Sequence, residues 1–229
     1  MSASEFQRAR SHNQKEERRR HLLQVTRSLL SEHPDVRAFG LNELARQSGM
    51  TKSNVYRYFE SRESLLLELL QEEWSLWYGE LKRDFGPEDQ PATLEKVAGI
   101  FSRSTASRPL LAHLTSVLPS IIEHNLSVER IREFKRASLE LLHELATFMH
   151  VRTPQLSVSA FEEFVHLAIM MTTGIWPFSH PSATALEAIQ TPGLTPFQYD
   201  FERDLNRGLL LLLRGLSQGL PIAVSRLEL

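Results

Sequence analysis

Residues 41–59 carry a concentration of hydrogen-bonding side chains that could recognise a polar partner. The stretch reads LNELARQSGMTKSNVYRYF, and a single glycine, Gly49, separates its two short helical patterns. Lysine and asparagine can hydrogen-bond to guanine and adenine edges, while serine, tyrosine and arginine can bind phosphates or bases. The residue types of the second pattern therefore suit contacts with a nucleic acid. They are Lys52, Ser53, Asn54, Tyr56, Arg57 and Tyr58.

The residues around this polar set predict a helix, a turn and a second helix that exposes the polar side chains. Val55 and Phe59 lie about one helical turn apart and can anchor the second pattern on neighbouring helices. Gly49 is predicted to end the first pattern in the left-handed conformation, and N–H groups near Thr51 would point toward a phosphate. Helix, turn and helix together form the helix-turn-helix arrangement, whose second helix enters the DNA major groove. A plain helical hairpin with a polar face is the alternative that the turn alone leaves open.

Helical periodicity continues along the rest of the chain, and no segment alternates as a strand would. The sequence therefore predicts an all-α fold, with a three-helix domain at residues 1–62 and a larger helical domain at residues 63–229. Two runs, LAIMM at 167–171 and LLLLL at 209–213, are apolar around the whole helix and need a thick core or a subunit interface. The predicted helices span residues 14–32, 41–48, 51–59, 62–84, 92–106, 109–123, 127–149, 155–177 and 196–218.

Charge is divided unevenly between these two parts. Residues 1–62 contain 12 Lys and Arg against seven Asp and Glu, a balance of +5, whereas the remainder has 14 against 21, a balance of −7. The basic N-terminal part, residues 1–62, indicates contact with a polyanion, although a solvated charged helix would have the same composition. The absence of cysteine excludes disulfides and thiolate metal sites and suits a cytoplasmic location. No apolar run approaches the roughly 20 residues of a membrane helix, and we expect no signal peptide.

Signatures of enzymes are scarce. The chain has no glycine-rich phosphate loop, no HExxH motif and no glycine-flanked serine nucleophile, so no catalytic residue, metal or cofactor is predicted. One rival pattern exists, because two helices each carry a Glu-x-x-His spacing, as in the di-iron site of ferritin-like bundles. An oxygen-activating enzyme is therefore a remote alternative. Its ligands would be Glu140 with His143, Glu163 with His166, and Glu73 and Glu123.

Residues 41–67, LNELARQSGMTKSNVYRYFESRESLLL, resemble the DNA-binding signature of TetR-family transcriptional regulators. LARQSG corresponds to the first helix of that signature, MT to the turn, VYRYF to the recognition helix, and ESRESLL to the start of the next helix. The resemblance covers roughly residues 14–80, and it is specific because matching positions recur across three consecutive helices. It implies a sequence-specific regulator that binds double-stranded operator DNA and is not an enzyme.

The resemblance also implies roles for single residues. Thr51 corresponds to the helix cap that binds phosphate, and the three residues after it fall where the family reads bases. The two tyrosines of VYRYF fall where hydroxyl groups meet the DNA backbone, and the arginine between them can reach base or phosphate. The implied DNA-binding residues are Thr51, Lys52, Ser53, Asn54, Tyr56, Arg57, Tyr58 and Arg62.

Two positions depart from the family pattern. Gly40 stands where the family usually has a threonine that caps a helix and touches phosphate, so this contact is in doubt. Arg62 replaces the usual lysine, which keeps the charge but changes the hydrogen-bonding geometry. Ahead of the first helix, Arg8 and Arg10 could form a basic arm that enters a minor groove, or a simple tail.

For the larger domain, the resemblance implies regulation and dimerisation. Family members dimerise through the last two long helices, which would place two recognition helices about 34–36 Å apart on a pseudo-palindromic operator. They also enclose a pocket, and a ligand here would be mainly apolar or aromatic because few charges intersperse the apolar helix faces. A DNA-binding dimer without a small ligand, under protein control or constitutive, remains an alternative. The candidate pocket residues, which ordinary core packing would equally explain, are Trp74, Trp77, Phe101, His113, Phe148, His166, Met170 and Trp176.

Overall fold

The computed structural model describes residues 3–32, 35–87 and 90–219, with the backbone alone for residues 3–12. Throughout these ranges the regular structure is helical and no strand forms, which confirms the all-α prediction. None of the helices in these ranges is long and apolar enough to cross a membrane. The α-helices are α1 (Ala3–Glu32), α2 (Leu41–Gln47), α3 (Lys52–Val55), α4 (Arg62–Phe85), α5 (Leu94–Ala106), α6 (Pro109–Val117), α7 (Val128–Arg152), α8 (Val158–Ser179), α9 (Ala183–Ile189) and α10 (Phe201–Ser217).

The helices α1 and α6 differ most from the prediction at one of their ends. The first helix begins at Ala3 rather than near residue 14, so Arg8 and Arg10 lie within α1 and not in an extended arm; their side chains are outside the described ones. Good helix formers, namely Ala, Glu, Gln and Arg, make up about half of residues 3–13 and continue the helix. The helix predicted at 109–123 instead ends at Val117 and passes through a π-helical turn, η1 (Leu118–Ile122), into a 3₁₀ turn, η2 (Glu123–Asn125). Pro119 within η1 has no N–H to donate to a regular α-helical ladder.

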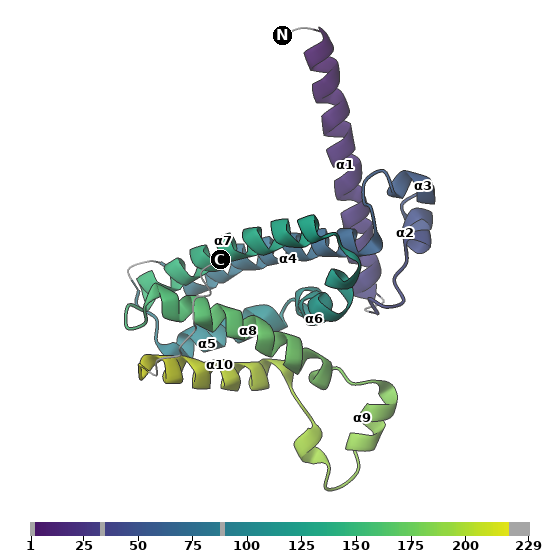
Figure 1. The fold of residues 1–229 in the computed structure, drawn as a ribbon. Coiled ribbons are helices and arrows are strands. Elements are labelled where there is room, and N and C mark those ends of the chain that lie inside the picture. The colour runs from purple at the N-terminus through teal and green to yellow at the C-terminus, as the bar shows by residue number, and fades with distance from the viewer. Residues whose placement is uncertain (1–2, 33–34, 88–89, 220–229) are drawn as a thin grey trace.

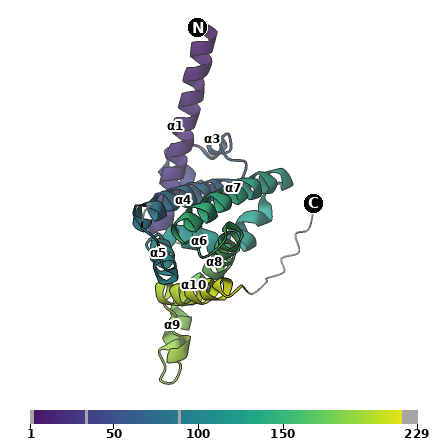
Figure 2. The same cartoon turned by 90° about the vertical axis from the view of Figure 1, so that its left-hand side faces the viewer.

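We call α1 to α3 the head and α4 to α10 the body. In Figure 1, α1 projects from the body with α2 and α3 beside it, and α4 begins next to them and runs into the body. There α4 packs on α5, α6 and η1, α7 packs on α8, and α10 packs on α5 and α8. Helix α9 extends away from the rest of the body in both views (Figures 1 and 2). The head is therefore joined to the body mainly through α4.

The two helices with all-round apolar runs are only partly covered within one chain. In α10, Leu205, Leu209 and Leu213 are fully buried at four-residue spacing, but Leu211 is 62% exposed. In α8, Met170 is 59% exposed and Phe178 is 65% exposed. The chain thus buries one face of each helix and leaves large apolar side chains of another face uncovered.

Candidate nucleic-acid interface and effector cavity

The helix-turn-helix forms as the sequence predicts, although its second helix is shorter. Gly49 adopts a φ of 66°, the left-handed conformation that ends α2. The Thr51 side chain caps α3 by accepting the backbone N–H of Asn54 at 3.3 Å. Regular α-helix ends at Val55 rather than near residue 59, because the N–H groups of Arg57 and Tyr58 bond three residues back, to Asn54 and Val55, and tighten the last turn.

Two side chains hold this unit on the rest of the head. Val55 and Phe59 are buried, which confirms them as the anchors of the second helix. Arg19 of α1 fastens the end of the unit: its guanidinium lies 4.8 Å from the centre of the Phe59 ring and donates to the Tyr58 carbonyl at 3.0 Å. The same guanidinium pairs with Glu68 of α4. The unit is thus clamped between α1 and α4.

The remaining side chains of the unit face outward. Arg57 is exposed, and its side chain makes no hydrogen bond or ion pair with the described residues. The Lys52 ammonium lies 5.9 Å from the centre of the exposed Tyr56 ring, so these two side chains share one side of the unit. Asn54 and Tyr58 are half-buried. The exposed members of the predicted set are Thr51, Lys52, Ser53, Tyr56 and Arg57.

Arg62 has a different environment from the other predicted DNA contacts. Its guanidinium donates to the carbonyls of Arg37 and Phe39, both at 3.2 Å, and pairs with the buried carboxylate of Glu63 at 2.8 Å. These bonds tie the start of α4 to the loop that precedes α2. In that loop Gly40 occupies the α2 cap position, and no side chain caps the helix there.

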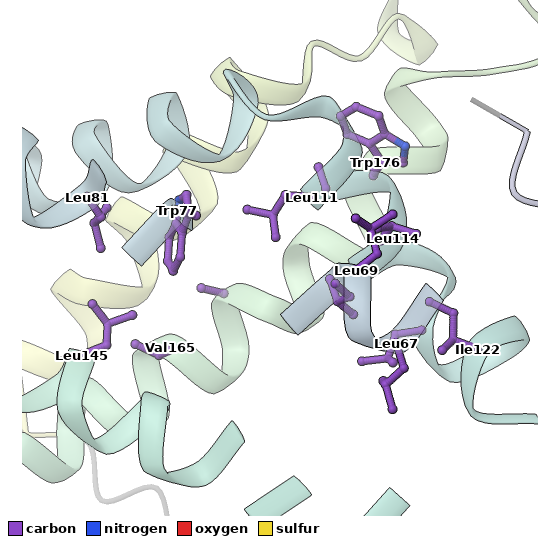
Figure 3. Close-up of a cluster of buried hydrophobic side chains, with 14 of the residues drawn as sticks. Leu67, Leu69, Trp77, Leu81, Leu111, Leu114, Ile122, Leu145, Val165 and Trp176 are labelled. Carbon is purple, nitrogen blue, oxygen red and sulfur yellow. The ribbon is translucent and has the colours of Figure 1, made fainter. Parts of the chain in front are cut away.

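An apolar cavity of about 300 Å³, which we call the inner cavity, lies within the body between α4, α5, α6, η1, α7 and α8. Trp74 of α4 stacks on Phe134 of α7, with ring centres 5.6 Å apart. Figure 3 shows Trp77 of α4, Leu145 of α7 and Val165 of α8 gathered in one part of the core. All five side chains line the cavity, and most of its other lining residues also come from α7 and α8.

Five of the eight candidate pocket residues line the inner cavity: Trp74, Trp77, Phe101, His166 and Met170. The other three do not. Phe148 lies three residues beyond Leu145 and points at α4, where it contacts Tyr78 and Phe85. His113 and Trp176 line a separate hollow nearer the head, and Figure 3 shows Trp176 apart from Trp77.

Several polar residues of the inner cavity escaped prediction. Thr172 of α8 is 4% exposed, and its hydroxyl makes no hydrogen bond with the described residues. A threonine within a strongly apolar helix was the available signal. Thr115 accepts a hydrogen bond from the Trp74 indole at 3.3 Å, and Lys135 at the wall is paired with Glu123 at 2.5 Å. The inner cavity therefore combines apolar walls with a few hydroxyl groups and one neutralised charge.

The two Glu-x-x-His motifs do not assemble a metal site. His143 instead pairs with Glu162, with Nδ1 and Oε1 2.8 Å apart. Glu73 and Glu123, the carboxylates that would complete a di-iron centre, are bonded to arginine and lysine side chains. Within the described ranges no three His, Asp or Glu side chains are placed to hold a metal ion. The di-iron hypothesis therefore has no site there for its ligand pairs, Glu140 with His143 and Glu163 with His166.

Two protein families match adjacent parts of the chain. The description "Bacterial regulatory proteins, tetR family" matches residues 22–69. The description "Tetracyclin repressor-like, C-terminal domain" matches residues 71–219, more than half of the chain. The chain belongs to the TetR family. As a TetR-family member it is a transcriptional regulator whose head is a helix-turn-helix DNA-binding unit, and the two matched ranges meet within α4.

Solved structures include similar folds. A transcriptional regulator from Rhodococcus sp. Rha1 is 14% identical, with a TM-score of 0.53, over 88% of this chain and 96% of that one. The transcriptional regulator FadR from Bacillus subtilis, solved in complex with stearoyl-CoA, is 18% identical, with a TM-score of 0.49, over 84% of this chain and 96% of that one. No curated protein matches the chain in sequence. At 14% identity, the Rhodococcus structure supports the TetR-family fold alone.

Proposed function

We propose that this TetR-family protein is a homodimeric repressor that binds a pseudo-palindromic operator. It leaves the operator when a small, mainly apolar ligand fills the inner cavity. The observation that carries the proposal is that α4 serves both sites: its first residue, Arg62, holds the loop before α2, and Trp74 and Trp77 supply part of the cavity wall. Because bacterial DNA lies in the cytoplasm, the protein would act there.

The exposed and half-buried polar side chains at and after the start of α3 are the proposed DNA contacts. Lys52, Ser53 and Asn54 at the start of α3 would read bases, and Tyr56 and Arg57 on the following turn would bind bases or phosphates. The half-buried Tyr58 would add a hydroxyl contact to phosphate, and Thr51 would present the N-terminus of α3 to another phosphate. For Arg62 the intramolecular bonds favour a positioning role, since four donor contacts already occupy its guanidinium. Residues 1–62 would thus form the DNA-binding domain.

Uncovered apolar side chains support the dimer. Phe178 of α8 and Leu211 of α10 expose most of their surface to solvent in the single chain. Large exposed apolar groups on neighbouring helices are typical of interfaces that a second copy covers. A two-fold axis beside α8 and α10 would then present two heads to one operator.

The ligand class follows from the wall of the inner cavity. Its volume of about 300 Å³ is at the small end of ligand pockets. Apolar side chains form most of the wall, and the Thr172 hydroxyl, which makes no hydrogen bond with the described residues, could bond a single polar group of the ligand. A ligand that binds one orientation of α4 better than another would shift the population of head positions, and with it operator affinity.

DNA selection tests the first half of the proposal. The protein of 229 residues would be used to select bound sequences from a random pool, and its mass in solution would be measured by sedimentation. We expect a palindromic consensus with half-sites one helical turn or a multiple apart, and a dimeric mass at micromolar concentration. An asymmetric consensus together with a monomeric mass would contradict the dimer.

A variant with a smaller inner cavity tests whether a ligand in that cavity releases the operator. Compounds from a small apolar library that raise the melting temperature would be assayed for operator release. Val165→Phe reduces the inner cavity from its wall, and we expect this variant to lose both the thermal shift and the release while it still binds operator. Operator release that persists unchanged in Val165→Phe would place the ligand elsewhere. If no compound acts, the alternative of a regulator without a small ligand gains support.

A further inference from the structure

A second hollow of about 970 Å³ lies between the head and the body, and we call it the head–body cleft. Its head side comes from the end of α1 and the loop that follows, and its body side from α4, α6 and the end of α8. It shares no lining residue with the inner cavity. The cleft is therefore a separate candidate site, independent of the function proposed for the inner cavity.

Ion pairs cross the cleft and neutralise most of its charge. Glu73 of α4 is buried and accepts from Arg27 of α1 at 2.8 Å and from Arg108, the residue before α6, at 2.9 Å. Arg108 also pairs with Glu80 at 2.6 Å, and this hydrogen bond lowers the pKa of the Glu80 carboxyl. The network joins head to body, and it leaves little net charge on these four side chains.

Among the described residues that line the cleft, Arg37 is a cation without a partner. Arg37, in the head loop, is exposed, and its guanidinium makes no ion pair or hydrogen bond with the described residues. The nearby carboxylate of Asp35 is used locally, since it accepts the backbone N–H groups of Arg37 and Ala38 at 2.9 and 3.3 Å. A free guanidinium at a lining position is suited to a carboxylate, which it can bind through two parallel hydrogen bonds.

The rest of the wall is apolar and aromatic. Leu76 of α4 is 50% exposed although it lies within a concave site. Trp176 stacks on His180 with ring centres 3.7 Å apart, and its indole N–H donates to Nδ1 of His113 at 3.1 Å. Burial lowers the pKa of His113, so this ring is neutral at neutral pH and adds no charge. The cleft thus offers aromatic and aliphatic surface beside one cation, Arg37, that has no partner among the described residues.

We propose that the head–body cleft binds a small aromatic carboxylate, whose ring lies against Leu76 and Trp176 and whose carboxylate pairs with Arg37. Ligand sites are frequent between domains. Because an occupant would touch α1 and its following loop as well as α4, α6 and α8, it would restrict the position of the head relative to the body. Operator affinity would then depend on this ligand as well as on the contents of the inner cavity.

The distribution of tryptophan makes the site testable. The chain has three tryptophans; Trp176 lines the cleft, and Trp74 and Trp77 line the inner cavity. The probe is 4-iodobenzoate, an aromatic carboxylate whose heavy atom quenches a nearby indole. We expect saturable quenching in the unmodified protein and in Trp74→Phe/Trp77→Phe, and no saturable quenching in Trp176→Phe. Saturable quenching that survives in Trp176→Phe, or purely linear quenching in the unmodified protein, would overturn the proposal.

Charge variants refine the test. Leu76→Asp places a negative charge in the cleft on a half-exposed side chain, and we expect it to weaken 4-iodobenzoate binding at least about tenfold through like-charge repulsion. Leu186→Asp, at a similarly exposed leucine on α9 outside both hollows, is the matched control and should leave binding unchanged. Neutral 4-iodobenzamide should bind at least about fivefold more weakly than the acid. Equal affinities in the two variants, or for the two compounds, would contradict the assignment.

A second readout concerns the head. Saturating 4-iodobenzoate should change the operator affinity of the unmodified protein by at least about threefold and leave that of Leu76→Asp unchanged. If 4-iodobenzoate leaves the operator affinity of both proteins unchanged, occupation of the cleft does not affect the head, and this part of the proposal is refuted.

Discussion

The head holds its helix-turn-helix on little buried surface, whereas the long helices of the body pack around a continuous core. Helices α2 and α3 span seven and four residues, and Val55 is the buried residue of α3. By contrast, α4 alone buries eleven side chains along 24 residues. A short helix that must face DNA cannot also bury much apolar surface, so the head depends on a few anchors.

The two regions are also joined differently. Within the body, helices meet through apolar and aromatic side chains, such as the edge-to-face contact of Trp77 with Phe101 at 5.0 Å. Much of the polar contact between the head and the body consists of arginine–carboxylate pairs, for example Arg27 with Glu73 and Arg19 with Glu68. Apolar packing holds the body as one unit. The arginine–carboxylate pairs, which are directional, can fix the orientation of the head relative to the body without a large buried area. Substitutions in the head, in the body and in the ion pairs between them test this difference between the two regions.

Phe59→Ala tests whether a few anchors hold the head. Phe59 is fully buried, and such a truncation costs about 3–5 kcal/mol of unfolding free energy. We expect operator binding to be lost and an early unfolding transition to appear in urea, followed by circular dichroism. The matched variant Phe161→Ala, at a fully buried site in α8, should lower the main transition of the body instead. Unaltered operator affinity in Phe59→Ala would show that the head has other supports.

Glu73→Gln tests the ionic connection between head and body. The buried carboxylate accepts from two arginines, and hydrogen bonds to charged groups contribute about 1.5–3 kcal/mol each. Because Arg27 and Arg108 are partly solvent-accessible, we expect a loss of about 2 kcal/mol in the free energy of unfolding. Glu72→Gln is the control, since this more exposed partner of Arg27 should contribute less than about 1 kcal/mol. Equal losses for the two variants would argue against a special role for the buried carboxylate.

Arg57→Ala and Tyr56→Phe test the outward face of the head. Loss of a base contact should cost about 1–3 kcal/mol of operator binding and relax specificity at one base pair, while loss of a phosphate contact weakens all sequences alike. Thermal stability should change little because both side chains are exposed. Arg132→Ala, an exposed arginine of α7, should not affect binding. If both head variants bind operator normally in gel-shift titrations, α3 is not the reading helix.

Gly40→Thr should produce the smallest effect, and in the stabilising direction. Gly40 has φ −138° and ψ 151°, which any residue can adopt, and a Cβ atom at this position would have no neighbour within 4 Å. A threonine cap should add a few tenths of a kcal/mol of stability. It should also tighten operator binding if its hydroxyl reaches a phosphate. Thermal melting and operator titration together separate these two gains, and lower stability would mean that the loop cannot accept the side chain.

Local signals in the chain were sufficient for much of the fold. Gly49, Thr51 and the spacing of Val55 and Phe59 determine the helix-turn-helix because caps, turns and anchors act over a few residues. The limits of α4, α5 and α10 likewise lie within five residues of the predicted ones. The early end of α3 escaped prediction, since the tightened turn at Arg57 and Tyr58 has no clear sequence signature.

Local sequence signals could not predict which residues line the inner cavity and which line the head–body cleft. Trp77 and Trp176 look alike in the sequence as large apolar residues at helical spacing, yet one lines the inner cavity and the other the head–body cleft. Similarly, Arg57 and Arg62 are both basic residues near α3, but Arg57 is free among the described residues while Arg62 is bonded to two carbonyls and a carboxylate.

The sequence alone was enough to predict an all-helical chain and a helix-turn-helix whose second helix has an exposed side, because each depends on periodicity and on neighbours within a few positions. Which arginines are occupied, which aromatic residues border a cavity and where the head meets the body depended on side chains that lie far apart in the chain. Those relations arise when helices cross, and the crossing of α1, α4, α6 and α8 brings together Arg27, Glu73, Arg108 and Trp176 around a cleft that no single segment encodes.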